Sequence, residues 1–479
     1  MAKQLLLGYT VLDAAYQNGR FMEVLGENPG TSGNLSDIDN PKNAGISLGA
    51  TTSDPVIFSY AWNPSTVRVL LGKITTNAGT VPSMSCAYSL LESPDQTAAV
   101  GTWKALGTDV ELLYGDTKVA TNPHGVAHIG NTLYIGDYDA QKIYLLGADA
   151  LNGQTGGSYP LGKAPYDLSQ GTDADLPPNA KGQAIIALAD EDKNTYLFVL
   201  YIVANDSATE HQEGILVKLS VDPDNGSLSY VDRVEVGKNP QEIIPVTNGD
   251  KDVYLLVPGI GGSQGSSTNG TESTIVSVPA FASSFTATPL LTGDSASYDI
   301  RVIGASAQAN NNSLVFILTA NFTSDWLGVN WKLYQTTVSK LLGTGGITLS
   351  AAVTNQTLSV ADQGTTAFSD YSGVYFLDLL YENAVQANGK ERLWFFRGSP
   401  LVVTVADAYG SPTQTGNAYN FYTVGSESGQ LGGKNVNSAD LFAETIRQAA
   451  AGASLKRGVR ATKAPAAARA AAPAEEEEK

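Results

Sequence analysis

Short apolar segments recur along the chain at intervals of about 60 residues, and this repeat constrains the fold more than any single motif. Seven of them align with one another, and they begin at Gln4, Pro55, Asn131, Asn194, Asp252, Asn312 and Glu391. Most have a further extended segment before and after them, as residues 184–190 precede and residues 214–222 follow the fourth. Three to four strands per repeat, apolar on both faces, are typical of a β-propeller.

The composition favours an all-β chain and excludes some partners. The 479 residues include 49 Gly, and 42% are hydrophobic while only 16% are charged. The formal net charge of −18 excludes nucleic acid, because phosphate binding needs a basic surface. The single cysteine, Cys86, excludes a disulfide within the chain. No apolar stretch approaches the ~20 residues of a membrane span, and no signal peptide is expected in this sequence, because the first apolar run is too short for its core.

Several repeats resemble known propeller families. Residues 162–168 (GKAPYDL) and 236–259 are similar to the YVTN repeats of lactonase-like seven-bladed propellers, and residues 123–146 resemble an NHL-type blade. The resemblance implies a single seven-bladed β-propeller over residues 1–430. It also implies that the first repeat lacks its innermost strand, which residues 417–424 or the segment near 431–440 would supply to close the ring.

The chain changes character outside the repeats. Residues 92–116 between the second and third repeats are either an insertion or an irregular outer strand. Residues 437–452 predict a short C-terminal helix, because Asn437 or Ser438 can cap it and apolar residues follow on one face. Residues 453–479 predict a disordered, flexible low-complexity tail of alanine, proline and charged residues.

The spacing of the conspicuous histidines and aspartates indicates structural roles and not a metal site. His124 and His128 lie in a predicted strand, where four residues span about 13 Å, so one metal ion cannot bind both. Asp137 and Asp139 follow an apolar run and are expected to end the strand by hydrogen bonding to the backbone. The DPDNG segment at 222–226 predicts a hairpin turn, because the spacing of a calcium loop is absent. No metal site and no cofactor are predicted.

The lactonase-like resemblance implies that any chemistry would take place in the central channel. Catalytic candidates that could face it are His124, Asp167, Asp299 and Arg301. Asp299 stands in SYDIRV, which echoes the PYD of GKAPYDL, so the repeat alone can also explain both aspartates.

Few histidines and no recognisable catalytic motif favour a non-enzymatic binding or structural/assembly protein, as in a subunit of an extracellular or surface assembly. One alternative is a lactonase-type hydrolase or isomerase, and a second is a phage or filament structural protein. The expected partner is a protein or a second copy of the chain, and a glycan or a small ligand is an alternative binding partner. An extracellular or surface location is favoured over a cytoplasmic one.

Overall fold

A computed structural model describes parts of the chain between residues 5 and 442. The described residues are 5–11, 19–25, 46–50, 55–63, 68–77, 83–92, 104–119, 123–137, 140–147, 158–170, 175–203, 213–240, 242–248, 252–259, 261, 272–294, 299–305, 314–322, 328–367, 377–382, 392–397, 417–422, 428–434 and 438–442. Nearly all regular structure in these residues is β-strand, which confirms the predicted all-β class.

The described strands form seven sheets, numbered here along the chain. The first sheet has the order β3 (Ile46–Ala50), β2 (Gly19–Leu25), β1 (Leu5–Val11) and β31 (Ser438–Phe442). The second runs from β4 (Pro55–Asn63) through β5 (Arg68–Asn77) and β6 (Ser83–Glu92) to β7 (Lys104–Tyr114), where β8 (Thr117–Lys118) and β12 (Ser158–Pro160) are added. The third contains β9 (Pro123–Ile129), β10 (Thr132–Asp137), β11 (Lys142–Gly147) and β13 (Tyr166–Asp167).

The other four sheets repeat this up-and-down order. The fourth contains β14 (Ala180–Ala189), β15 (Thr195–Val203), β16 (Glu213–Val221) and β17 (Leu228–Lys238). The fifth contains β18 (Ile244–Asn248), β19 (Asp252–Gly259), β20 (Thr274–Pro279), β21 (Thr288–Thr292) and the added β25 (Ile347–Thr348). The sixth contains β22 (Asp299–Ala305), β23 (Leu314–Phe322), β24 (Gly328–Thr337) and β26 (Ser359–Ala367), and the seventh contains β27 (Leu377–Glu382), β28 (Arg392–Arg397), β29 (Asn417–Tyr422) and β30 (Ser428–Lys434).

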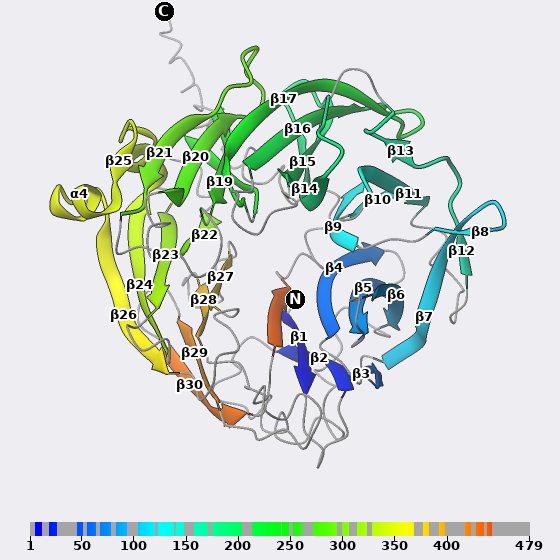
Figure 1. The fold of residues 1–479 in the computed structure, drawn as a ribbon, viewed down its shortest axis with the longest axis horizontal. Coiled ribbons are helices and arrows are strands. Elements are labelled where there is room, and N and C mark those ends of the chain that lie inside the picture. The colour runs from blue at the N-terminus through cyan, green and yellow to red at the C-terminus, as the bar shows by residue number, and fades with distance from the viewer. Residues whose placement is uncertain are drawn as a thin grey trace, which may run out of the picture.

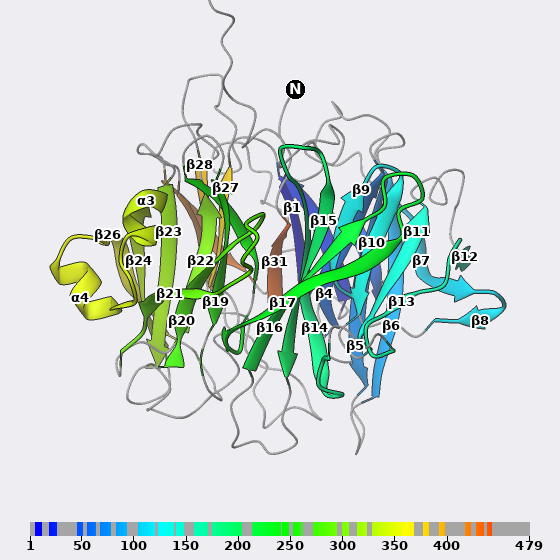
Figure 2. The same ribbon diagram turned by 90° about the horizontal axis from the view of Figure 1, so that it is seen from above.

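The sheets are arranged in a ring, so the fold is propeller-like. In Figure 1 the first strand of most sheets, such as β4, β9, β14 and β22, lies towards the centre and the last strand lies at the periphery. Seen edge-on in Figure 2, the sheets stand side by side around the ring. The short helix α4 (Leu349–Thr354) lies on the outside of the ring in Figure 1, and the short helix α3 (Val338–Leu342) packs against β18, β21 and β24 of the fifth and sixth sheets.

The last described strand pairs with the first. Strand β31 pairs antiparallel with β1, with Leu6 opposite Phe442 and Thr10 opposite Ser438. The predicted helix over residues 437–452 is therefore wrong where it is described, since residues 438–442 are a strand. Without this partner the backbone groups along one edge of β1 would lie unpaired, and this need outweighs the local helix signal. Residues 443–452 and the predicted tail lie outside the described residues.

The repeat read from the sequence matches the strands closely, with one exception. The run that begins at Pro55 is the first strand of its sheet, β4, whereas the other six runs correspond to second strands: β1, β10, β15, β19, β23 and β28. Residues 104–114 form the strand β7, so this part of the irregular segment between the second and third repeats belongs to the sheet.

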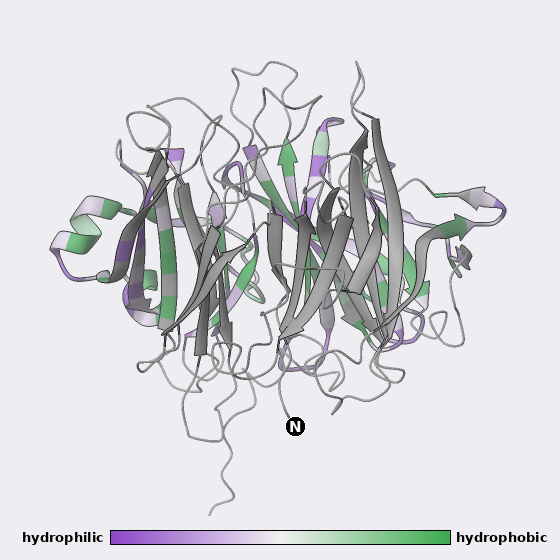
Figure 3. Cartoon of the chain, turned by 90° about the horizontal axis from the view of Figure 1, so that it is seen from below, coloured by the Kyte–Doolittle hydropathy of each residue, from purple (hydrophilic) through white to green (hydrophobic). Residues whose placement is uncertain are grey.

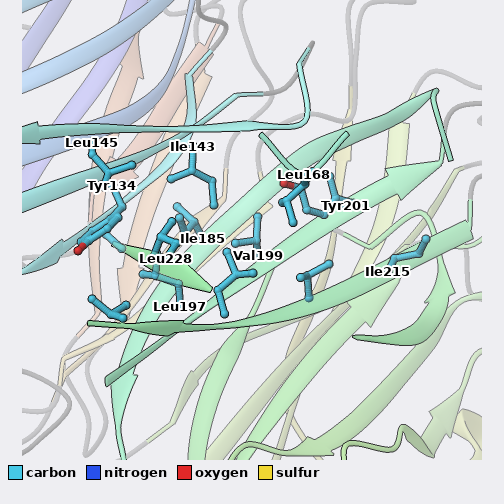
Figure 4. Close-up of a cluster of buried hydrophobic side chains, with 14 of the residues drawn as sticks. Tyr134, Ile143, Leu145, Leu168, Ile185, Leu197, Val199, Tyr201, Ile215 and Leu228 are labelled. Carbon is cyan, nitrogen blue, oxygen red and sulfur yellow. The ribbon is translucent and has the colours of Figure 1, made fainter. Parts of the chain in front are cut away.

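The core lies between neighbouring sheets. One cluster joins the third and fourth sheets, and Figure 4 shows Tyr134, Leu197 and Tyr201 among its members. Two more clusters join the fourth to the fifth sheet and the fifth to the sixth. Figure 3 shows apolar residues spread along the coloured strands, as expected for sheets covered on both faces. No helix of the described residues is long and apolar enough to cross a membrane.

Candidate functional site

A groove of about 460 Å³ opens on the outer part of the fourth sheet. Its floor comes from β16 and β17, and one wall comes from the segment 175–178 that precedes β14. Charged groups and apolar surface line it together: Asp175, Leu176, Pro177, Pro178, Val203, Glu213, Ile215, Arg233 and Glu235.

Two carboxylates of the groove lie diagonally across the strand pair. Glu235 on β17 is opposite Ile215 on β16, and Glu213 lies two residues before Ile215 on the same strand. Diagonal neighbours on one face of an antiparallel pair are about 7–8 Å apart. Both side chains are exposed, and neither forms a hydrogen bond or ion pair with another described residue. They are therefore available to a ligand.

The strand register beside the groove depends on a bulge. Glu213 pairs with Lys238 and Ile215 with Glu235, so β17 carries one extra residue in this interval. Gly237 lies in it with a φ of 73°, a conformation that a residue with a side chain adopts at a cost.

Arg233 connects the floor of the groove to its wall. Its Nη2 atom lies 3.5 Å from the Asp175 Oδ2 atom, and its Nη1 donates to the Asp175 backbone carbonyl. Asp175 has a left-handed backbone with a φ of 42°, which aspartate tolerates better than most residues. Because Asp175 already pairs with the guanidinium, Glu213 and Glu235 carry the uncompensated negative charge of the groove.

The wall is anchored on the third sheet. The Pro177 carbonyl accepts hydrogen bonds from the Ala180 backbone at 2.9 Å and from the Gln141 side chain. Gln141 is 5% exposed and belongs to the turn between β10 and β11. The third sheet therefore fixes a wall that encloses residues of the fourth.

The groove continues over the edge of β17 into a second depression of about 480 Å³. The two share Ile215, Arg233 and Glu235, and the second adds Val234, Thr286 and Ala287. Thr286 and Ala287 come from the segment that leads to β21 in the fifth sheet. Glu235 therefore lies at the junction of an elongated depression that spans two sheets.

The candidate residues from the sequence lie elsewhere and apart. His124 is in β9 and Asp299 and Arg301 are in β22, each the first strand of its sheet, and their side chains lie outside the described residues. Asp167 is in β13 at the opposite, outer edge of the third sheet, so it is not on an inner strand with them. A catalytic role for His124, Asp299 and Arg301 stays a prediction.

Asp167 has local partners at this outer edge. Its Oδ1 atom accepts from the Ser169 backbone at 3.0 Å, and its Oδ2 lies 3.5 Å from the Lys142 Nζ. Burial tends to raise the pKa of Asp167, but the hydrogen bonds from Ser169 and the charge of Lys142 outweigh it and lower the pKa. Asp167 thus ties β13 to β11.

Two of the turns predicted from the sequence are confirmed. Asp137 ends β10, and its carboxylate accepts from the Ala140 backbone at 3.3 Å and from the Tyr144 hydroxyl at 2.8 Å. Residues 222–226 form the hairpin between β16 and β17, where Asp222 accepts from the Asp224 backbone at 2.8 Å. Asp139 lies outside the described residues. Among those described, no three His, Cys, Asp or Glu side chains gather as they would around a metal ion.

Comparison with known proteins gives structural neighbours only. No protein-family model matches the sequence, and no curated protein matches it. A Trypanosoma rangeli sialidase in complex with sialic acid matches 85% of this chain with a TM-score of 0.39 and 9% identity, and this chain covers 56% of the sialidase.

Two further structures match. Apo AztD from Citrobacter koseri has a TM-score of 0.36 and 11% identity, over 91% of this chain and 99% of that one. A Bacillus subtilis levansucrase in complex with oligosaccharides has a TM-score of 0.33 and 9% identity, over 78% of this chain and 87% of that one.

These matches correct the function that the sequence favoured. A non-enzymatic binding or assembly protein, with the lactonase and the phage or filament protein as alternatives, is contradicted by neighbours that include a sialidase and a levansucrase. Few histidines do not by themselves exclude an enzyme, because carboxylates alone can supply both an acid and a base.

Proposed function

We propose that this protein is a glycan-processing enzyme that cleaves a glycosidic bond in the groove on β16 and β17. The observation that supports this most directly is the pair Glu213 and Glu235, two unpaired carboxylates on one face of a strand pair. Glycosidic bond hydrolysis needs one carboxylic acid to protonate the leaving oxygen. It also needs one carboxylate on the other face of the sugar, which activates a water molecule or attacks as a nucleophile.

The expected spacing favours inversion of configuration. Diagonal neighbours of a regular strand pair have backbone positions about 7–8 Å apart, and two flexible glutamate side chains on such positions can set their carboxyl groups at the roughly 6.5–9.5 Å of inverting enzymes, which leaves room for a water molecule. A retaining mechanism needs only about 5–5.5 Å. In this proposal Glu235 protonates the leaving group, because it lies where the two depressions meet, and Glu213 activates the water.

Arg233 has a positioning role in the proposal. Its guanidinium holds the wall through Asp175, so the width of the groove depends on this ion pair. The remaining lining, Leu176, Pro177 and Ile215, offers apolar surface to the carbon faces of a sugar ring.

We also propose that each of the seven sheets is a blade of a seven-bladed propeller related to the YVTN and NHL repeat types. The pairing of β31 with β1 supports this, because it joins the last described strand to the first sheet. The proposed propeller therefore extends to residue 442 instead of ending at 430.

The test is hydrolysis by the purified protein of a panel of p-nitrophenyl glycosides and soluble polysaccharides. Glu213→Gln and Glu235→Gln keep the shape of each side chain, and each is expected to lower kcat by about 100-fold or more without changing the melting temperature. Asp192→Asn changes an exposed carboxylate in the turn after β14 and is the matched control.

Two outcomes would contradict the proposal. Either Glu variant could retain wild-type turnover on a glycan that the protein hydrolyses, which would place the chemistry elsewhere. The product could also emerge with retained anomeric configuration in a proton NMR time course, which the proposed inverting mechanism does not allow.

A further inference from the structure

A lysine lies inside the apolar contact between the fourth and fifth sheets. Lys218 is in the middle of β16, in the run GILVKLSV, and is 6% exposed. Residues alternate between the two faces of a strand, so Lys218 shares its face with Leu216, which packs against the fifth sheet. A charged side chain so placed needs compensation, because burial removes its ammonium group from water.

Four aromatic rings surround the ammonium group. The Lys218 Nζ atom lies 4.5 Å from the ring centroid of Tyr196 and 5.9 Å from that of Phe198, and both rings belong to β15. It lies 5.9 Å from the ring of Phe281 and 5.7 Å from that of Phe285. These two rings belong to the segment 280–287 of the fifth sheet, so two sheets supply the cage.

The rings are also packed against one another. The centroids of Phe198 and Phe281 are 6.4 Å apart with their planes at 64°, and those of Phe198 and Phe285 are 6.1 Å apart. Tyr196 and Phe281 are in contact at 5.9 Å. The cage is therefore a continuous aromatic structure that spans the junction of the two sheets.

One carbonyl completes the site. The Ala280 carbonyl oxygen accepts a hydrogen bond from the Lys218 Nζ at 2.8 Å, while the Ala280 backbone N–H donates to Val253 on β19 at 2.9 Å. Aromatic faces attract a cation through their negative quadrupole, and this attraction increases when water is excluded. Burial lowers the pKa of Lys218, and the charges of Asp190 and Asp232 oppose the shift.

We propose that the cage of Tyr196, Phe198, Phe281, Phe285 and the Ala280 carbonyl is a binding site for an organic ammonium ion, which the chain fills with the side chain of Lys218. The site is selective for positive charge and not only for volume. Its occupation holds the segment 280–287, and with it the fifth sheet, against the fourth. This inference is independent of the glycan-processing proposal, because no groove carboxylate takes part.

The proposal predicts that the site can be emptied and refilled. Lys218→Ala retains the Cβ atom and removes three methylene groups with the ammonium, which is the size of n-propylammonium. We expect the variant to melt at a lower temperature than the wild type, and n-propylammonium chloride to restore the melting temperature in a saturable manner. The neutral 1-propanol, which can still donate to the Ala280 carbonyl, should give at most a tenth of the apparent affinity.

Two controls separate a specific site from a salt effect. Lys340→Ala removes an exposed lysine from α3, and its melting temperature should respond to n-propylammonium no more than that of the wild type. Lys218→Met keeps a long side chain in the cage without the charge, so it should melt below the wild type and show no recovery with n-propylammonium. If Lys218→Ala does not fold alone, its refolding yield with and without n-propylammonium serves as the readout.

Clear results would overturn the inference. A Lys218→Met variant as stable as the wild type would show that the site needs volume and not charge. Equal stabilisation of Lys218→Ala by 1-propanol and n-propylammonium would show the same. No recovery of either the melting temperature or the refolding yield with n-propylammonium would show that the cage is not a binding site.

Discussion

The hydroxyl group of Tyr134 joins the third sheet to the hairpin of the fourth. Removing this group is expected to lower the free energy of unfolding near neutral pH, and this loss should disappear at high pH. Tyr134 is fully buried, and its Oη donates to the Gly226 carbonyl at 2.8 Å. Tyr134→Phe removes this bond and leaves the ring in place. Because Gly226 is partly exposed, water can reach its carbonyl, and near neutral pH we expect a loss of about 1 kcal/mol in the free energy of unfolding.

The pKa of Tyr134 sets the pH dependence. Burial raises this pKa to about 12, above the value of about 10 in an unfolded chain. As pH rises above about 10, the unfolded chain releases the proton while the folded chain keeps it, so this group's stability contribution falls as pH rises towards 12. The loss is about 1.4 kcal/mol at pH 11 and no more than about 2.7 kcal/mol over the whole interval.

Tyr134→Phe has no such dependence, so the two proteins should converge as pH rises and become equally stable near pH 11. Urea unfolding followed by tryptophan fluorescence, at steps between about pH 8 and about pH 11.5, measures the difference. Burial also raises the pKa of Tyr201, but this residue is present in both proteins and cancels. A difference that stays constant across the pH range would refute the argument.

Three further changes test the packing and closure of the ring. Gly182→Ala should destabilise the protein by about 1–3 kcal/mol in urea unfolding, because the new Cβ would lie 2.4 Å from the Asp137 carbonyl oxygen, whereas Gly147→Ala meets nothing within 4 Å and should change little. Asp222→Ala removes the acceptor for two hydrogen bonds of the hairpin turn. It should lower the free energy of unfolding by about 1 kcal/mol, and the melting temperature with it. Ending the chain after residue 436 removes β31 and should lower the melting temperature and promote association through the exposed edge of β1, while ending it after residue 452 should not.

Local chemistry explains why much of the fold could be predicted from the sequence. The runs at Asn194 and Asp252 form β15 and β19, because a sheet covered on both faces needs continuous apolar strands. The DPDNG turn was also predictable, since Gly226 adopts a φ of 73° that glycine permits and Asp222 bonds within the turn.

Pairing over long sequence distances explains what could not be predicted. The segment 438–442 has a helix signal of its own, and only its partner β1, more than 400 residues away in the sequence, makes it a strand. The groove was missed for a related reason. Glu213 and Glu235 come together through strand register, and the wall at 175–178 comes from a different part of the chain. The one available signal was the cluster of charges in DRVE at 232–235, in a chain with few charged residues.

Strand alternation places the groove and the ammonium cage on opposite faces of β16. Glu213 and Ile215 face the groove, while Leu216 faces the fifth sheet together with Lys218. A strand held by packing on one face keeps its position when the other face binds a ligand. A binding site can therefore be built on the outer strands themselves and does not need to be formed by loops. The aromatic cage fixes β16 from behind, and the Arg233–Asp175 ion pair fixes the wall in front. The position of Glu213 thus depends on contacts to both neighbouring sheets, and this argues that a groove at the periphery of the ring can be as rigid as a site at its centre.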